Sequence, residues 1–511
     1  MKEQKLMSGI SSNNKQIAKN TLFLYGRMLI VLFVSIYTTR VVLNVLGIED
    51  YGIYNVVCGF VAMFGFLNTS LSNGIQRFYN YEFSQNGEEG LKRVFQTSLL
   101  IQLCLAILIG ILVETIGIWY INTRMVIPTD RIVAANWIFQ FSVISLLLVI
   151  IQIPYSAAIL AHERMDYYAI VSIIDVLLKL GIILLLPYFD GDQLTFYGVL
   201  QVFVSLLDFI LYWGYSKIQF KELVVEKVFH KDLFSSIFKF SGWNIFATFA
   251  WMTQGQGVNM VVNLFFGTVI NAARGVSGQI QSAIQGFCEN LVIAFRPQLV
   301  QSYAQGNIER TEKMMFSMSK MMFILFGALS LPLCLEIDYI LSLWLGDSIP
   351  EYTAGFTILV LLSMFPRNFT LAFAQIVHAT GRLGKFQVVT AVIVMFSLPI
   401  TYLFLELGYN PMSVYWINLA MCVVLFCGCI IVLKQCFPIN LINYLKYVLW
   451  PCLLLAAVVI PITYSVTVIM SSSFCRLVIV TLVSSASILF FSLLFVLTNE
   501  EKRLLKSFMK K

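Results

Sequence analysis

Charge is scarce in this chain of 511 residues. Asp, Glu, Lys and Arg make up 12% of the sequence, about half of the share that is typical of soluble domains. Histidine occurs only three times, and the ten cysteines form no C-x-x-C pair and no Cys/His cluster with the spacing of metal ligands. A metal site of that kind is therefore excluded, and we predict that the cysteines are small residues of an apolar core.

Signatures of nucleotide hydrolysis and of hydrolytic enzymes are also absent. The nearest approach to a phosphate-binding loop is GRLGKF, from Gly381 to Phe386, which lacks the first glycine and the hydroxyl residue of that motif. There is no H-E-x-x-H and no G-x-S-x-G. We therefore expect no enzymatic activity, no cofactor and no direct coupling to ATP hydrolysis on this chain.

Apolar sequence dominates instead: 59% of the residues are hydrophobic and the mean hydropathy is +0.82. Runs of about 20 apolar residues, which suffice to cross a bilayer, recur along the chain and leave no room for a soluble domain. We predict an all-α polytopic membrane protein with about fourteen transmembrane helices. The predicted spans are 21–45, 52–76, 94–121, 132–158, 167–187, 193–215, 237–264, 272–296, 317–337, 353–378, 386–406, 412–434, 447–469 and 475–498.

The basic residues between these spans alternate from one side of the membrane to the other. With the N-terminus inside, most of the 34 Lys and Arg residues lie in cytoplasmic loops, as the positive-inside rule requires. Those on the outer side are Arg124, Arg131, Arg274 and Arg476. We therefore predict that both termini are cytoplasmic, and the net charge of +7 is explained without a nucleic-acid partner.

The sequence contains a weak internal repeat. A shift of 220 residues brings Gly47 onto Gly267, so that VLGIEDYG falls on FFGTVINA, and a shift of 212 places Pro154 on Pro366. Two halves in the same orientation are one known transporter architecture, with the substrate bound between them near the midplane. The predicted parts are a cytoplasmic segment 1–20, a six-helix lobe 21–215, a connector 216–236, a second lobe 237–434, an additional helix pair 447–498 and a cytoplasmic tail 499–511.

Several charged residues fall inside predicted spans, where charge is costly and usually faces a cavity or another charge. Asp175 and Lys179 can pair directly at i and i+4, or they can line a cavity. Arg367 follows Pro366, which opens the helix locally, so Arg367 either lines a cavity or binds the freed carbonyl groups. Arg27 lies well within the first span and has the same two alternatives.

Acidic residues divide into two groups by depth. Asp208 and Glu289 are buried acids that could bind a proton or a sodium ion, the alternative being a pair with a neighbouring base. Glu114, Glu336 and Glu406 fall near the outer ends of their spans, and we predict that they are interfacial.

The span 272–296 carries a polar stripe. Its polar side chains share one helical face, because at about 100° per residue they fall within an arc of roughly 80°. They are Arg274, Gln281, Gln285, Glu289 and Arg296. Such a stripe needs something polar to face, and amides suit sugar hydroxyls, although interhelical hydrogen bonds are the alternative for amides such as Asn259 in the preceding span.

Three stretches resemble a known family: NVLGIEDYGIYNVV from Asn44, IPYSAAILAHERMDYYA from Ile153, and VINAARGVSGQIQSAIQGF with FRPQLVQSYAQGN from Val269. They are similar to the polysaccharide repeat-unit flippases for O-antigen and capsule, of the multidrug/oligosaccharidyl-lipid/polysaccharide (MOP) exporter superfamily. The resemblance covers the first twelve spans. It implies a V-shaped, two-lobed transporter of the bacterial inner membrane, whose cavity holds a polyprenyl-pyrophosphate sugar by means of basic residues.

From the residues and the resemblance together, we predict translocation of undecaprenyl-pyrophosphate-linked oligosaccharides, with membrane lipids, glycosyltransferases and a polysaccharide polymerase as partners. The substrate-binding candidates are Arg27, Lys179, Arg274, Arg367, Gln281, Gln285 and Asn259. The candidates for proton or sodium coupling are Asp208, Glu289 and Asp175. Two alternatives stay open: the buried acids also suit a cation-coupled multidrug exporter, and fourteen helices resemble a lipid II flippase.

Overall fold

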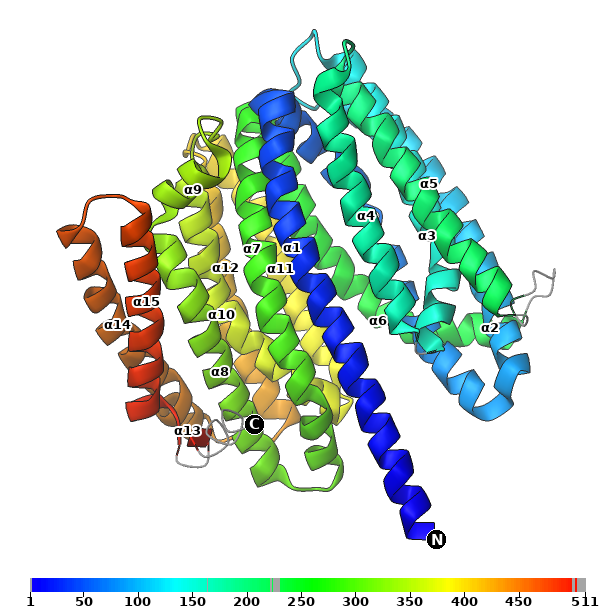
Figure 1. Ribbon diagram of the computed structural model, residues 1–511, viewed down its shortest axis with the longest axis vertical. Helices are drawn as coiled ribbons and strands as arrows, with labels where there is room; N and C mark the ends of the chain where they lie inside the picture. The colour runs from blue at the N-terminus through cyan, green and yellow to red at the C-terminus, as the bar shows by residue number, and fades with distance from the viewer. Residues whose placement is uncertain (1, 163, 221–222, 224–229, 499–500, 503–511) are drawn as a thin grey trace. The chain divides into compact units, whose positions relative to one another are not determined.

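The computed structural model describes residues 2–162, 164–220, 223, 230–498 and 501–502, and up to residue 29 it describes the backbone alone. All regular secondary structure in this part is helical (Figure 1). The contacts group the chain into two compact units, Met1–Ala272 and Ala273–Lys511. Each unit is described by itself below.

The first unit contains six helices and the beginning of a seventh. They are α1 (Lys2–Met63), α2 (Phe66–Thr123), α3 (Ile132–Ala161), α4 (Met165–Leu185), α5 (Gln193–Gln219), α6 (Lys231–Met252) and the start of α7 (Val258–Ala304). Helix α6 packs on α2, which is why it groups with the first unit. The predicted lobe boundary at 216–236 rests on the repeat rather than on contacts, and it stays a prediction; most of that connector lies outside the described residues.

The second unit contains the rest of α7 and eight further α-helices. They are α8 (Ile308–Leu335), α9 (Ile337–Leu345), α10 (Thr353–Thr380), α11 (Leu383–Glu406), α12 (Met412–Cys436), α13 (Leu441–Tyr444), α14 (Trp450–Ile469) and α15 (Phe474–Phe491). Helices α14 and α15 pack on each other and on α8 (Figure 1). The short helix α9 was not predicted.

Twelve segments of the described chain are long and apolar enough to cross a membrane. Two of them each combine two predicted spans, because Ile30–Met63 contains a sharp turn at Gly47 and Thr248–Val292 contains one at Gly267. The prediction of an all-helical membrane protein with about fourteen helices is therefore confirmed.

The turns at Gly47 and Gly267 have nearly the same backbone conformation. The dihedral angles are φ 78° and ψ 171° at Gly47, and φ 72° and ψ −165° at Gly267. This conformation is essentially restricted to glycine, so one residue reverses the chain where a longer loop would otherwise be needed. The shift of 220 residues that reveals the repeat also places Gly47 on Gly267. The repeat is therefore visible in the backbone as well as in the sequence.

Residues next to the two turns pack closely within the first unit. A Cβ atom placed on Gly52 would lie 2.0 Å from the carbonyl oxygen of Thr268, far inside van der Waals contact. Only glycine allows the backbone after Gly47 to approach the backbone after Gly267 in this way.

A charge network joins α1 to the N-terminal ends of α3 and α5 in the first unit. The Arg131 guanidinium, just before α3, donates from Nε to Asp50 Oδ1 at 2.7 Å and forms an ion pair with Asp192 Oδ1 at 2.8 Å. Asp192 also caps α5 by accepting from the Thr195 amide at 3.0 Å. Partial burial acts to raise the pKa of Asp192, but the hydrogen bonds from Thr195 and the Arg131 charge outweigh it, so that this pKa lies below its ordinary value.

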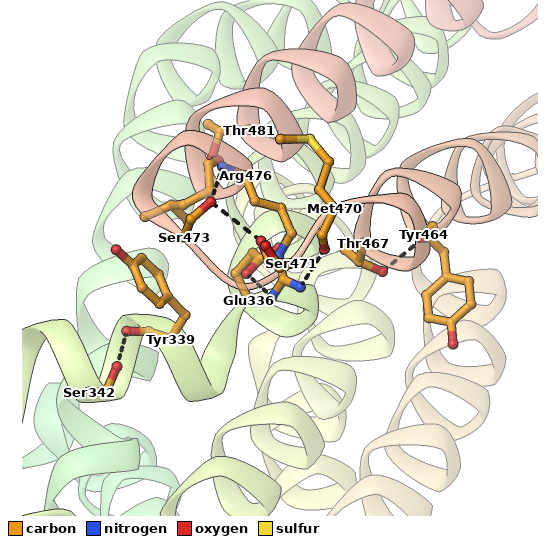
Figure 2. A network of polar contacts seen from close by, with 11 residues as sticks. Glu336, Tyr339, Ser342, Tyr464, Thr467, Met470, Ser471, Ser473, Arg476 and Thr481 are labelled. Atoms are coloured by element: carbon orange, nitrogen blue, oxygen red, sulfur yellow. Dashed lines mark hydrogen bonds and ion pairs between the residues drawn. The ribbon is translucent and has the colours of Figure 1, made fainter.

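Two ion pairs connect α8 with α15 and with the segment that follows α15. At one end, Glu336 follows α8 and its Oε2 accepts from Arg476 Nη2 of α15 at 2.7 Å, with side chains 0% and 15% exposed. Figure 2 shows this contact together with the hydrogen bond from Arg476 Nη1 to the Met470 carbonyl. Glu336 lies at a helix end as predicted, but it is buried against a partner helix rather than interfacial.

In the middle of α8, Lys320 Nζ lies 2.6 Å from Glu501 Oε2, and these side chains are only 3% and 6% exposed. Ser317 also donates to Glu501, and the Thr498 amide donates to it at 2.7 Å. Burial acts to raise the pKa of the Glu501 carboxyl, but the hydrogen bonds and charge of Lys320 and Ser317 outweigh it, so that this pKa is lowered. Stability from this carboxylate is therefore present above the ordinary glutamate pKa and is lost as the pH falls through the lowered value.

The buried pair gives a prediction about stability. Lys320→Met should lower the free energy of unfolding by about 3–5 kcal/mol, because Glu501 is left charged and unpaired in an apolar environment. The double variant Lys320→Met/Glu501→Gln should recover most of the loss. The measurement is the thermal unfolding midpoint of the purified protein in detergent.

The control for this prediction lies on the same helix. Lys313 and Glu309 form an ion pair at 2.7 Å with side chains 63% and 77% exposed, so Lys313→Met should leave the midpoint unchanged. Equal, small effects of Lys320→Met and Lys313→Met would contradict the role assigned to the buried pair.

Candidate functional site

The predicted site residues fall in both units. The first unit contains Asp175, Lys179, Asp208 and Asn259, and the second contains Arg274, Gln281, Gln285, Glu289 and Arg367. Arg27 belongs to α1, but its side chain lies outside the described residues, so its role stays a prediction.

The polar stripe of α7 makes contacts to two neighbouring helices of the second unit. Arg296 Nε donates to Gln375 Oε1 of α10 at 2.8 Å. The Ser277 hydroxyl lies 3.1 Å from the Tyr415 hydroxyl of α12, and the Arg274 guanidinium lies 5.5 Å from the centre of the same Tyr415 ring, within the range of a cation–π contact. The two ends of the stripe are therefore held by partners on α10 and α12.

The middle of the stripe is less tightly held. Gln285 Nε2 donates to Glu289 Oε1 at 2.7 Å, one turn away on the same helix. Gln281 and Gln285 are half-buried. Glu289 is exposed, so the prediction that it is a buried acid was wrong. A carboxylate exposed to lipid would be costly, so the exposed face of Glu289 indicates a water-accessible surface on this part of α7.

Arg367 stands in α10 directly after Pro366, which lies inside the helix. Its side chain is at least partly buried, and Glu289 is the carboxylate whose charge acts on it. Arg367 and Glu289, which the sequence suggested separately, are therefore within range of an electrostatic interaction. Their opposite charges reduce the cost of keeping either one within the membrane.

Asn368 is a polar residue of this region that the sequence analysis missed. It is 4% exposed, and its side-chain amide interacts with the Cys288 thiol of α7. This contact joins α10 to α7 inside the second unit. Its position beside Arg367, in the polar sequence PRNFT, was the available signal.

In the first unit, Lys179 and Asp175 form the ion pair that their spacing allows, with Lys179 Nζ 2.7 Å from Asp175 Oδ1. Asp208 of α5 interacts with both of them. The three side chains therefore form one cluster between α4 and α5.

Asn259 is buried among hydrogen-bond partners of the first unit. Asn271 Nδ2 donates to Asn259 Oδ1 at 2.6 Å and to its carbonyl oxygen at 2.8 Å, and Asn259 Nδ2 donates to the Asn55 carbonyl at 3.4 Å. Asn259 is 8% exposed and Asn271 is fully buried. These contacts are the interhelical hydrogen bonds that the sequence analysis weighed as the alternative to sugar binding.

An apolar cavity of about 210 Å³ lies where the additional helix pair meets the rest of the second unit. Its walls come from α8, α10, α14 and α15 and include Phe323, Leu362, Phe365, Val459 and Ile488. The ion pairs of Glu336 and Lys320 lie beyond its two ends along α8.

No family model and no curated protein matches the sequence, but solved structures match the fold. The lipid II flippase MurJ, in an inward closed conformation, has a TM-score of 0.68 at 12% identity over 94% of this chain and 98% of that chain. An inward-facing multidrug resistance MATE family transporter of the MOP superfamily has a TM-score of 0.66 at 13% identity over 79% and 95%. The MATE multidrug transporter DinF-BH has a TM-score of 0.63 at 13% identity over 82% and 95%.

These matches define the class of fold. The chain is a multi-pass helical membrane protein with the fold of MATE and MOP-superfamily transporters. The structural relatives include multidrug transporters and a lipid II flippase, and the identities of 12–13% extend the likeness to the fold alone.

The contacts of Asn259 give a prediction that separates packing from binding. Asn259→Leu and Asn271→Leu should each lower the free energy of unfolding by about 1–3 kcal/mol, because each leaves a buried amide without its partner. Gln281→Leu, on the half-buried stripe, should leave stability unchanged. The measurement is the thermal unfolding midpoint without substrate. Normal stability of Asn259→Leu combined with impaired transport would instead assign Asn259 to the substrate.

Proposed function

We propose that this protein is a flippase of the bacterial inner membrane that moves undecaprenyl-pyrophosphate-linked oligosaccharide units to the outer leaflet for O-antigen, capsule or exopolysaccharide synthesis. The observation that carries the proposal is the arrangement around Arg367. A guanidinium lies in the middle of a membrane helix, next in sequence to the buried Asn368 amide and within range of the charge of Glu289 on the polar stripe of α7.

The chemistry of this arrangement suits the head group of such a substrate. A pyrophosphate accepts charge-assisted hydrogen bonds from a guanidinium, and these are stronger than bonds between neutral groups. Gln281 and Gln285 offer both donors and acceptors, as sugar hydroxyls require. Arg27, Lys179 and Arg274 stay additional candidates for the pyrophosphate, and Arg274 is held against Tyr415 at the far end of the stripe.

The additional helices favour a lipid-linked substrate over a soluble drug. The lipid II flippase fold covers 94% of this chain, whereas the two multidrug transporters cover 79% and 82%. The match to the lipid II flippase therefore includes more of this chain, for which we predict two helices beyond the two six-helix lobes. The apolar cavity between α8, α10, α14 and α15 supplies a surface on which a polyprenyl tail can lie while the head group crosses.

Two alternative functions are also compatible with the fold. A lipid II flippase shares the same fold and a similar head-group chemistry, and it would make the gene essential. A multidrug exporter is suggested by the MATE neighbours and by the acidic residues Asp208 and Glu289. Basic residues such as Arg367 disfavour it, because they repel cationic drugs.

Arg367 provides the test. Arg367→Ala should reduce transport about 10- to 100-fold, since a hydrogen bond to a charged group contributes about 1.5–3 kcal/mol. Surface polysaccharide should fall and undecaprenyl-linked units should accumulate on the inner leaflet. Arg27→Ala should behave in the same way. The measurements are immunoblots of surface polysaccharide and analysis of lipid-linked sugars, at equal protein level.

The control variant is Arg382→Ala, which removes an exposed arginine just after α10 and should have no effect. Unchanged polysaccharide in Arg367→Ala at normal protein level would reject the assignment of the pyrophosphate to Arg367. An intact polysaccharide together with reduced efflux of cationic dyes in a deletion strain would favour the multidrug exporter, and loss of viability would favour the lipid II flippase.

A further inference from the structure

An open pocket of about 480 Å³ lies at the end of the first unit where α3 and α5 begin. In the predicted orientation this end faces the outside of the membrane. The two helices pack on each other, and the pocket is formed by their first turns and by the residues just before them. Its lining combines charged and aromatic side chains, namely those of Asp130, Arg131, Asp192, Trp137, Phe189 and Phe196.

The polarity of this lining changes in the same direction along both helices. At the start of α3, the charged Arg131 is followed by Val133 and Trp137. At the start of α5, the charged Asp192 is followed by Val199. At 1.5 Å per residue, the charged and apolar ends of the lining lie roughly 10 Å apart along the helix axes. The pocket therefore has a charged rim and an apolar inner part, which suits an amphiphile at a membrane interface.

The aromatic side chains of the pocket are held by packed partners. The Phe189 ring stacks on the Phe196 ring, with 4.0 Å between the ring centres and 11° between the planes. A Cβ atom on Gly191 would lie 2.5 Å from the Phe189 ring, so this placement of the ring requires glycine at position 191. Trp137 stacks on Phe141 at 5.6 Å and is still 52% exposed. Both Phe189 and Trp137 therefore keep ring surface for a ligand.

The charges of the pocket do not balance. Among the described residues that line it, Arg131 is the one base. Its guanidinium is already bound to two carboxylates, those of Asp50 at 2.7 Å and Asp192 at 2.8 Å. Asp130 is exposed and has no hydrogen bond or ion pair with another described residue. The pocket thus carries an excess of negative charge, which attracts a cationic group.

We propose that this pocket binds the headgroup of a phospholipid that carries an ammonium group, as phosphatidylethanolamine does. The ammonium group donates to the Asp130 carboxylate and lies against the Trp137 ring, where a cation–π contact adds to the attraction. The phosphate faces Arg131, whose Nη1 donates to no described residue. The acyl chains continue past Val133 and Val199 into the bilayer.

An ammonium-bearing lipid fits this pocket better than an anionic lipid or a sugar. A lipid whose phosphate is its sole charge is repelled by the excess of carboxylates, and no group on that lipid offsets the repulsion. A sugar can stack on Trp137 and donate to Asp130, but it has no part for the apolar side chains deeper along the helices. Tryptophan is common at membrane interfaces in general, whereas the carboxylates beside it need a partner of opposite charge. The proposal does not depend on which substrate the chain transports.

The test compares two lipids with identical acyl chains, phosphatidylethanolamine and phosphatidylglycerol. Each is titrated into the purified, delipidated protein in detergent and an amine-free buffer, and the rise of the thermal unfolding midpoint gives the dissociation constant. The wild-type protein should bind phosphatidylethanolamine about 10-fold more tightly. Asp130→Asn should weaken that binding about 3- to 5-fold. Trp137→Leu, which keeps an apolar side chain without the aromatic face, should weaken it about 2- to 5-fold.

The matched controls are Asp190→Asn and Trp119→Leu, which change an exposed aspartate and an exposed tryptophan of the first unit outside the pocket lining. Both should keep the wild-type preference for phosphatidylethanolamine. Equal affinity of the wild-type protein for the two lipids would overturn the proposal, and so would an unchanged preference in both pocket variants. Displacement of phosphatidylethanolamine by a soluble oligosaccharide would also overturn it, because the pocket would then belong to a sugar. The exposed Asp130 has no described partner, so Asp130→Asn should fold normally, which its unfolding midpoint without lipid checks.

Discussion

The low polarity of the bilayer is the constraint on which this structure depends. Without water, each backbone amide and carbonyl must bond within the protein, so a chain that crosses repeatedly becomes a set of helices. The same cost governs charge, and Lys320 and Arg476 each meet a carboxylate within 2.7 Å. One pair lies in the middle of α8 and the other directly after its C-terminal end, and together they tie α15 and the segment after it to α8.

Glycine allows the chain to change direction sharply within a single residue. At Gly47 and Gly267 a single residue with positive φ turns the backbone without a loop, so no run of unsatisfied amides enters the interface. Gly52 then lets one turn region touch the backbone at Thr268. The repeat in the sequence is weak because it preserves these few backbone requirements, while the side chains around them are free to change.

Local features of the sequence predicted local features of the structure. Hydropathy located the helices, and the spacing of Asp175 and Lys179 predicted their ion pair. Features that depend on distant partners were missed: Glu336 was expected at the interface, but its partner Arg476 is 140 residues away. Likewise, nothing in the periodicity of α5 showed that Asp208 interacts electrostatically with Asp175, since that depends on how α4 and α5 pack. The roles of the site residues stay predictions, because the structural relatives share the arrangement of the helices with this chain and give no information about the roles of its side chains.

The two units differ in the charge they bury, and the repeat makes this difference informative. Under the shift that aligns Pro154 with Pro366, Arg367 corresponds to Tyr155, so the basic group belongs to the second half alone. Under both shifts the counterparts of Asp175 are uncharged (Gln387 or Met395), and so are those of Asp208 (Ala420 or Gly428). Arg367 and the cluster of Asp175, Lys179 and Asp208 thus belong to different halves of the repeat. In the transporter that we propose, ligands bound in the two halves would be coupled through a change of conformation that both ligands bias, as alternating access requires.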